Sequence, residues 1–270
     1  MAHRLSDHGR GVALCLASAA GFGLMAIFAK QAYAEGVSVS TLLALRFSLA
    51  AIVFWAIVAP RRPARPVRSV ALVGLGMGAI GYAAQSALFF GALTHIDASL
   101  TALLLYTYPA LVFGVALLLG RERGGARRLS ALALSTVGTV LVLLGGASGT
   151  ADGVGIAMGL GSAVAYTAYI LVADRVGGRL DPMLLSALVA SGAAASFVTF
   201  GVVTGRLDLG LTAEGWLWIV LLTGFSTVLA VSFFLLGLPK VGPAAASILS
   251  TLEPVVTVAL AMIVFSERLA

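Results

Sequence analysis

Charged residues are scarce in this chain, where Asp, Glu, Lys and Arg together make up 10% of 270 residues. A soluble domain needs roughly a quarter of its residues charged. Hydrophobic residues instead reach 60%, and the mean hydropathy is +1.06. This shortage of charge excludes a soluble globule. No ten-residue segments of alternating polarity occur, so the pattern predicts an all-α integral membrane protein and not a membrane β-barrel.

Cysteine is almost absent as well, because Cys15 is the only one. A single cysteine excludes an intrachain disulfide and a zinc cluster. Gly76–Gly81 has the glycine spacing of a dinucleotide-binding loop, but it lies inside an apolar run with no preceding strand. The sequence also lacks a Walker A lysine and a nucleophile–base pair. We therefore expect no metal, no cofactor and no enzymatic activity.

The net charge of +6 is carried by short basic clusters between the apolar segments. Clusters of this kind are typical of membrane loops, so we expect no nucleic-acid partner. About 20 apolar residues are needed to cross a bilayer as a helix. Segments of that length predict nine spans, near residues 11–32, 39–59, 68–93, 98–119, 128–146, 153–173, 182–204, 213–237 and 243–265.

The arginines and lysines also predict the orientation of the chain. Thirteen of the 17 fall in one alternating set of loops and three in the other, while Arg46 lies inside a span. Since basic loops stay in the cytoplasm, the N-terminus is predicted to be cytoplasmic. In a bacterium the protein would be a multi-pass component of the plasma (inner) membrane, with the lipid bilayer as its main partner.

The sequence contains an internal repeat. Residues 89–123 match residues 234–268 at a shift of 145, which aligns Pro109 with Pro254 and Glu122 with Glu267. An odd number of spans separates the two copies, so they would cross the membrane in opposite senses. We expect a first five-helix repeat in residues 1–146 and a second, inverted repeat in residues 147–270. The second repeat would have four helices here, its tenth helix missing from this chain.

These paired segments resemble the drug/metabolite transporter (DMT) superfamily, specifically its EamA-type exporters. The resemblance rests on the ALRF stretch around Arg46 and on PALVFGVALLLGRER and LEPVVTVALAMIVFSER, and it covers nearly the whole chain. Within the family the chain is most similar to YddG-type aromatic amino acid exporters. The resemblance implies a 5+5 inverted repeat, a central cavity and export of amino acids, metabolites or drugs.

Helical spacing places polar and aromatic residues on single faces of the predicted spans. Tyr82 and Gln85 share one face, and Tyr166 and Tyr169 share another. Such faces either line a cavity or pack against neighbouring helices. An amide such as Gln85 needs a partner or a ligand near the bilayer centre. The candidate substrate-binding residues are Phe22, Arg46, Tyr82, Gln85, Tyr106, Tyr166, Tyr169 and Thr251.

Glu253 lies midway along a predicted span, where a charge costs about 2.5–3.5 kcal/mol. It is either a proton-binding carboxylate that couples transport to a proton gradient, or a structural group that accepts hydrogen bonds or neutralises Arg46. Arg46 could instead bind a substrate carboxylate. Pro109 and Pro254 each remove a backbone hydrogen bond and predict matched helix kinks in the two halves.

The sequence therefore predicts a secondary transporter that exports small amphipathic metabolites, amino acids including aromatic ones, by alternating access around a central cavity. A drug or other metabolite exporter and a passive facilitator of the same fold are alternatives. A membrane-embedded enzyme or scaffold protein is the alternative from another class. Protons are possible coupling ions, and the protein is a monomer or a homo-oligomer.

Overall fold

The structure is a computed structural model that describes residues 2–63, 66–118, 152–176 and 180–267. Every regular element in these ranges is a helix. Eight helical stretches are long and apolar enough to cross a membrane: Asp7–Ala34, Val39–Arg61, Arg68–Ala92, Ala98–Val115, Gly153–Ala173, Pro182–Val203, Ala213–Val241 and Ile248–Phe265. They confirm eight of the predicted spans. The remaining one, at 128–146, lies outside the described residues.

Four of the eight stretches are α-helical along their length, and one of these four, Asp7–Ala34, consists of two consecutive helices. Helix α1 (Ala2–Gly23) starts nine residues earlier than the apolar pattern predicts, because the polar residues before position 11 extend the same helix. It is followed by α2 (Met25–Ala34), α3 (Val39–Arg61), α9 (Gly153–Val176) and α10 (Pro182–Val203). Ser38 caps α3 by accepting from Thr41 N at 3.2 Å, and Asp181 caps α10.

Two further stretches contain a segment of π-helix at corresponding places in the two halves. In the first, α4 (Arg68–Gly76) leads through η1 (Met77–Tyr82) to α5 (Ala83–Ala92). In the second, α11 (Ala213–Thr223) leads through η3 (Gly224–Leu229) to α12 (Ala230–Val241). Such wide turns are common next to functional sites. The hydrophobic pattern alone predicts no such change of helix type.

The last two stretches are interrupted near their middle. The first divides into α6 (Ala98–Leu105) and α7 (Tyr108–Leu118), with a turn at Tyr106 and Thr107. The second divides into α13 (Pro243–Ser250) and α14 (Leu252–Phe265), with a turn at Thr251. Each interruption lies two or three residues before a proline, Pro109 or Pro254, whose ring nitrogen cannot donate to the preceding turn.

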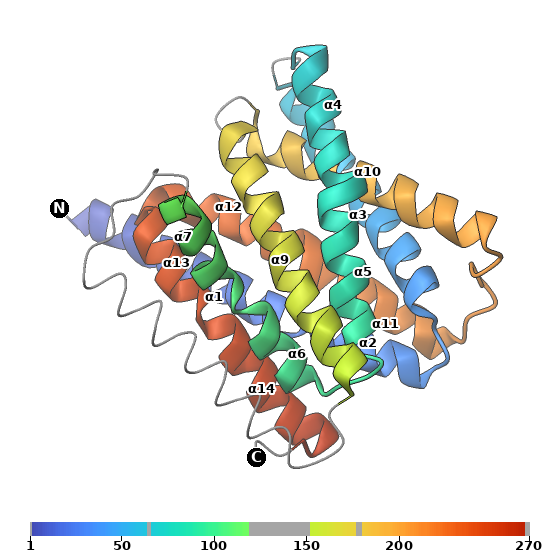
Figure 1. Cartoon of the computed structure of the whole chain (residues 1–270). Coiled ribbons are helices and arrows are strands. Elements are labelled where there is room, and N and C mark those ends of the chain that lie inside the picture. Colours follow the sequence, from blue (N-terminus) through green and yellow to red (C-terminus); the bar gives the residue numbers. More distant parts are fainter. Residues whose placement is uncertain (1, 64–65, 119–151, 177–179, 268–270) are drawn as a thin grey trace.

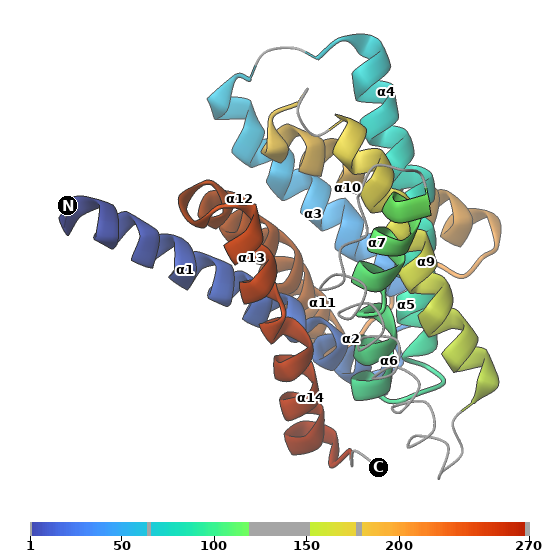
Figure 2. The ribbon, with the colours of Figure 1, turned by 60° about the vertical axis from the view of Figure 1, so that its left-hand side comes forward.

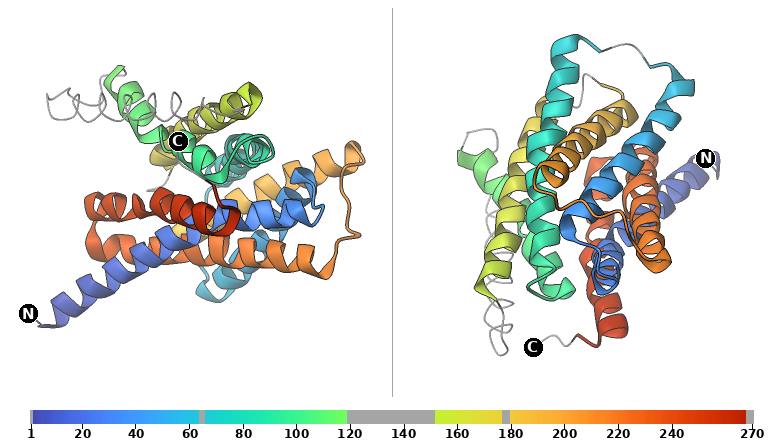
Figure 3. Two further views of the ribbon diagram at one scale, coloured as in Figure 1. Left: turned by 90° about the horizontal axis from the view of Figure 1, so that it is seen from below. Right: turned by 90° about the vertical axis from the view of Figure 1, so that its right-hand side faces the viewer.

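Helices of one half of the chain pack mainly against helices of the other half. Helix α1 contacts α12, α13 and α14 of the second half, and Figure 2 shows it crossing beside them. Helix α9, which aligns with α1 in the repeat, contacts α5, α6 and α7 of the first half. Helices α3 and α10 pack lengthwise, as the right-hand view of Figure 3 shows. The bundle is therefore built from helix pairs that each combine both halves.

The outer surface of the bundle is strongly apolar. Ile80 and Ile263 are 75% and 76% exposed, and many other large aliphatic side chains of the spans point outward. A soluble protein rarely exposes apolar patches on this scale. The buried core is formed by smaller and aromatic residues such as Phe47, Phe54 and Phe90. This distribution is the one expected for helices whose outer faces contact lipid.

Candidate functional site

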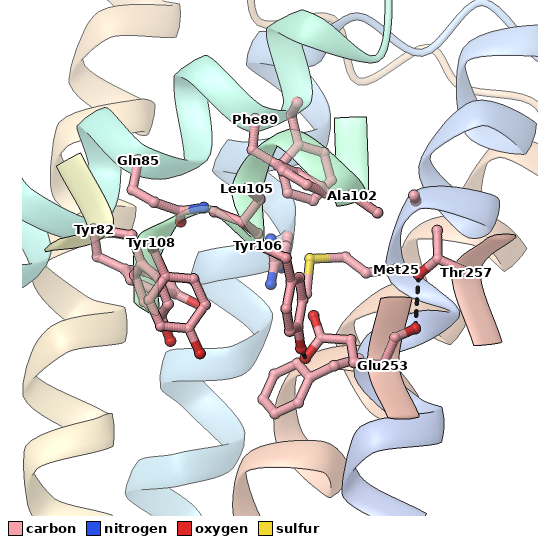
Figure 4. A pocket seen from close by; sticks show the side chains of 15 residues that line it. Met25, Tyr82, Gln85, Phe89, Ala102, Leu105, Tyr106, Tyr108, Glu253 and Thr257 are labelled. Carbon is pink, nitrogen blue, oxygen red and sulfur yellow. Dashed lines mark hydrogen bonds between the residues drawn. The ribbon is translucent and has the colours of Figure 1, made fainter. Parts of the chain in front are cut away.

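A cavity lies in the interior of the bundle, among helices that come from both halves of the chain (Figure 4). The space that the centre of a water molecule can occupy in this cavity is about 80 Å³. One water needs ~10–15 Å³ by the same measure, so the cavity has room for several. The lining residues are Phe22, Met25, Ala26, Arg46, Tyr82, Gln85, Phe89, Phe90, Ala102, Leu105, Tyr106, Tyr108, Tyr166, Glu253 and Thr257.

The structure brings most of the sequence-predicted site residues together around this cavity. Those in its wall are Phe22, Arg46, Tyr82, Gln85, Tyr106, Tyr166 and Glu253. Tyr169 lies behind the wall, where its ring stacks on Tyr166 with centroids 6.0 Å apart and approaches Tyr82 at 5.4 Å. Thr251 lies elsewhere: it is exposed, and its hydroxyl donates to the Ile248 carbonyl at 2.6 Å.

The interruptions in the helices explain why helical spacing assigned some of these residues differently. Residues two apart on a regular helix point in nearly opposite directions. The turn at Tyr106 and Thr107 changes this, so both Tyr106 and Tyr108 line the cavity. Sequence reasoning missed Tyr108 for this reason. It also missed Thr257, although the four-residue spacing from Glu253 is a signal that would have found it.

Arg46 is the most deeply buried charged residue of the cavity wall, with 1% of its surface exposed. Its Nε donates to Thr227 Oγ1 in η3 at 2.9 Å. Its guanidinium carbon lies 4.9 Å from the ring centroids of both Phe47 and Phe90, a cation–π arrangement. Among the residues that the structure describes, no hydrogen-bond partner is present for Nη2, and Arg46 forms no salt bridge.

Glu253 lies in the first turn of α14, directly before Pro254. The Tyr106 hydroxyl donates to Glu253 Oε2 at 2.7 Å and also lies 3.1 Å from the Ser250 carbonyl oxygen. That carbonyl would accept from residue 254 in a regular helix, but proline has no N–H to donate. A tyrosine from the first half thus supports the broken helix of the second half. Within the described part of the chain, Glu253 Oε1 has no hydrogen-bond partner.

A close approach between α1 and α14 holds Glu253 in place. A Cβ atom at Gly23 would lie 2.9 Å from the Glu253 carbonyl oxygen and 2.8 Å from Val256, closer than side chains pack. The Thr257 hydroxyl donates to the Gly23 carbonyl at 2.9 Å, where the chain passes from α1 to α2. Glycine is therefore required at position 23 so that α14 can bring its carboxylate to the cavity.

Gln85 fills part of the cavity wall close to Tyr82. It is 8% exposed, and its Oε1 accepts from the Ser86 hydroxyl at a long distance of 3.3 Å. Figure 4 shows its amide extending from α5 toward the rings of the cavity. The amide N–H groups have no acceptor among the described residues, so they are available to a bound solute or to water.

Glu267, just beyond α14, connects three helices at one end of the bundle. Its carboxylate accepts from Ala98 N at 2.9 Å and from Ser99 N and Oγ at 3.1 and 2.7 Å, which caps the N-terminus of α6. Lys30 Nζ of α2 donates to the same carboxylate at 3.2 Å and lies 3.7 Å from Asp97. Burial raises the pKa of Glu267, but the hydrogen bonds from Ser99 and Ala98 and the charge of Lys30 outweigh it and lower the pKa.

The contacts of Glu267 also show how the two copies of the repeated segment run. The end of the second copy touches the beginning of the first copy, at Ala98 and Ser99. The middles of the copies meet at Tyr106 and Glu253. The segments 98–118 and 243–265 are therefore antiparallel partners that cross beside the cavity.

Comparison with known proteins places the chain among transporters. The model of the EamA-like transporter family matches it twice, at residues 9–144 and 153–270. An uncharacterized transporter of Bacillus subtilis, YcbK, is 24% identical over 98% of this chain and 88% of its own length. An uncharacterized transporter of Archaeoglobus fulgidus is 25% identical over 96% of this chain and 89% of its own.

A solved crystal structure shares the fold. It superposes with a TM-score of 0.71 and 20% identity, and covers 96% of this chain and 91% of that one. The family match spans nearly the whole chain, and the matched relatives named above are transporters. The chain is a multi-pass membrane protein that belongs to the EamA-like transporter family of the DMT superfamily.

Proposed function

We propose that this transporter exports small amphipathic metabolites, principally amino acids including aromatic ones, by alternating access around the cavity described above. The observation that carries the proposal is Arg46, a buried guanidinium that lines the cavity without an anionic partner among the described residues. A buried charge is costly unless it is paired. A carboxylate on the solute supplies that pair, and Arg is well shaped to bind one.

The remaining wall supports an aromatic or amphipathic solute. Three phenylalanines and four tyrosines surround the cavity, and Tyr108 and Tyr166 meet edge to face with centroids 4.7 Å apart. Rings of this kind offer broad apolar faces for an apolar side chain. The hydroxyl and amide groups of Tyr82 and Gln85 add polar contacts.

The antiparallel crossing of the two repeated segments supports a 5+5 inverted repeat with a cytoplasmic N-terminus. Inverted repeats let one half take the conformation of the other, which opens the cavity on alternate sides. In this arrangement the basic loops face the cytoplasm. The Glu267 end then faces the outside, and there the carboxylate of Glu267 joins α14 to α6 and α2.

Counterflow in proteoliposomes tests the proposal. Vesicles that contain the purified protein are loaded with unlabelled phenylalanine, and uptake of labelled phenylalanine, leucine and aspartate is followed. We expect accumulation of the aromatic and apolar amino acids above protein-free vesicles. A protein that exchanges none of these solutes, although it is folded and monodisperse, would contradict the proposal.

A further inference from the structure

The cavity wall contains two opposite charges that are not paired with each other. Arg46 comes from α3 and Glu253 from the start of α14. The salt bridges within the described ranges join Lys30, His95 and Lys240 to acidic partners, and none joins Arg46 to Glu253 within 4.0 Å. The structure does not use the simplest way to neutralise two opposite charges that line one cavity.

Each of the two groups has a free side. The Arg46 guanidinium is held on one side by Thr227 Oγ1 at 2.9 Å, while its Nη2 has no partner in the described residues. The Glu253 carboxylate is held through Oε2 by Tyr106 at 2.7 Å, while Oε1 accepts no hydrogen bond from them. Each group is thus fixed by a neutral neighbour and keeps capacity for a charged one.

We propose that the cavity binds its solute as a zwitterion, with Arg46 holding the anionic group and Glu253 the cationic group. This inference rests on the proposed export of amino acids and defines how such a solute is recognised. A solute with both charges pairs both residues at once. A solute with only one charge leaves either the buried guanidinium or the half-buried carboxylate without a counter-ion, which is unfavourable.

The neutral neighbours give each charged group a defined position. Thr227 belongs to η3, where the wide π-turn displaces the backbone, and it orients the guanidinium through Nε. Tyr106 lies at the turn between α6 and α7, and its hydroxyl also reaches the Ser250 carbonyl that Pro254 leaves without its usual donor. One helix irregularity from each half thus positions one of the two opposite charges.

The rings between these groups suit the side chain of an α-amino acid. Phe90 contacts the guanidinium face at 4.9 Å, and Phe89 lies against Phe90 with centroids 5.4 Å apart. A ring face also attracts an ammonium group, so the aromatic wall alone could favour cations. The zwitterion proposal differs from that because it requires the carboxylate of Glu253 for discrimination.

Competition by phenylalanine analogues tests the proposal. Exchange of labelled phenylalanine in proteoliposomes is inhibited by unlabelled phenylalanine, by 3-phenylpropionate, which lacks the ammonium group, and by phenethylamine, which lacks the carboxylate. Loss of one charge-assisted contact changes binding by about 10- to 100-fold. We expect phenylalanine to compete at concentrations lower by that factor than either analogue.

Two variants assign the charges. In Glu253→Gln the advantage of phenylalanine over 3-phenylpropionate is expected to fall below about threefold, while its advantage over phenethylamine remains. In Arg46→Gln the reverse is expected. Glu214→Gln and Arg206→Gln remove exposed charges that do not line the cavity, and they serve as matched controls. Glu253→Asp and Arg46→Lys retain the charges and should preserve part of each preference, also where a glutamine variant fails to fold.

The outcomes separate this inference from the proposed function. If the unmodified protein exchanges no amino acid, both are overturned. If it exchanges amino acids but the order of the analogues is the same in Glu253→Gln and Arg46→Gln as in the controls, only the zwitterion proposal is overturned. A Glu253→Gln protein that loses its response to a proton gradient but keeps its discrimination would likewise overturn it and assign Glu253 to proton coupling.

Discussion

Replacing Glu267 with glutamine is expected to open the end of the bundle at which this carboxylate joins three helices. Glu267 follows α14, caps the N-terminus of α6 through Ala98 and Ser99, and pairs with Lys30 of α2. Its side chain is only 6% exposed. Because these contacts connect three separate helices, an opening of the bundle at this end would have to break them.

The size of the effect follows from what glutamine retains. It has the length of glutamate and one acceptor oxygen, but no charge. A carboxylate at a helix N-terminus is worth about 0.3–1 kcal/mol. Its pair with Lys30, whose side chain is 20% exposed, is worth up to about 1 kcal/mol. The combined loss of about 0.3–2 kcal/mol shifts the ratio of open to closed forms by a factor of about 2–30.

Thiol accessibility measures this shift. Cys15 is the only cysteine, so Cys15→Ala gives a thiol-free background in which Ala102→Cys places a reporter in the cavity wall. A membrane-impermeant maleimide, applied from the side of Glu267, should label the reporter about 2–30 times faster in Glu267→Gln. Asp97→Asn removes a 66% exposed carboxylate from the same end and should change the rate less than about twofold. An unchanged rate in Glu267→Gln would refute the reasoning.

The same assay has an expected pH dependence. The pKa of Glu267 is lowered in the closed form, so this form binds a proton more weakly than an open form with an ordinary carboxyl. The stabilisation of the closed form is present above the ordinary glutamate pKa and is lost as the pH falls through the lowered pKa. Acidification lowers the thiolate population of the reporter equally in both proteins, so the labelling rate of the parent protein relative to Glu267→Gln should rise as the pH falls.

Four further substitutions test the construction of the site. Gly23→Val should force α14 away and lower stability by about 1–3 kcal/mol, measured as a lower midpoint in thermal unfolding in detergent, whereas an unchanged midpoint would contradict the close packing. Thr227→Val removes the hydrogen bond from Arg46 Nε and should weaken solute binding several-fold without loss of folded protein; binding equal to that of the parent would count against it. Tyr82→Ala and Gln85→Ala should impair exchange while the proteins stay folded, and full flux in both would remove these residues from the solute site.

The helical spans are the part of the fold that the sequence predicts well. Long apolar runs interrupted by clusters of charge and proline have one stable arrangement in lipid, because every backbone group must be hydrogen-bonded within its own helix. Eight described helices lie where the runs place them. The repeat also predicts that positions near Pro109 and Pro254 are special, since both helices are interrupted there.

The local geometry of the cavity depends on contacts that periodicity does not contain. A regular helix through residue 251 would have put Thr251 on the cavity face, but the turn at that residue changes the helical phase and leaves it exposed. The partner of Arg46 is Thr227, 181 residues away and inside a π-turn. Such a contact arises from tertiary packing. The sequence therefore predicts seven of the residues that line the cavity, whereas the hydrogen bonds that hold them depend on tertiary packing.

A crystal structure with 4-bromophenylalanine tests most directly whether the cavity between the two halves receives the transported solute. The anomalous signal of bromine locates the ring independently of the protein density. The expected peak lies among the cavity rings near Phe90 and Tyr166, with the carboxylate at Arg46 and the ammonium group at Glu253. Bromine bound elsewhere on the protein, with the cavity containing no ligand, would contradict the central claim.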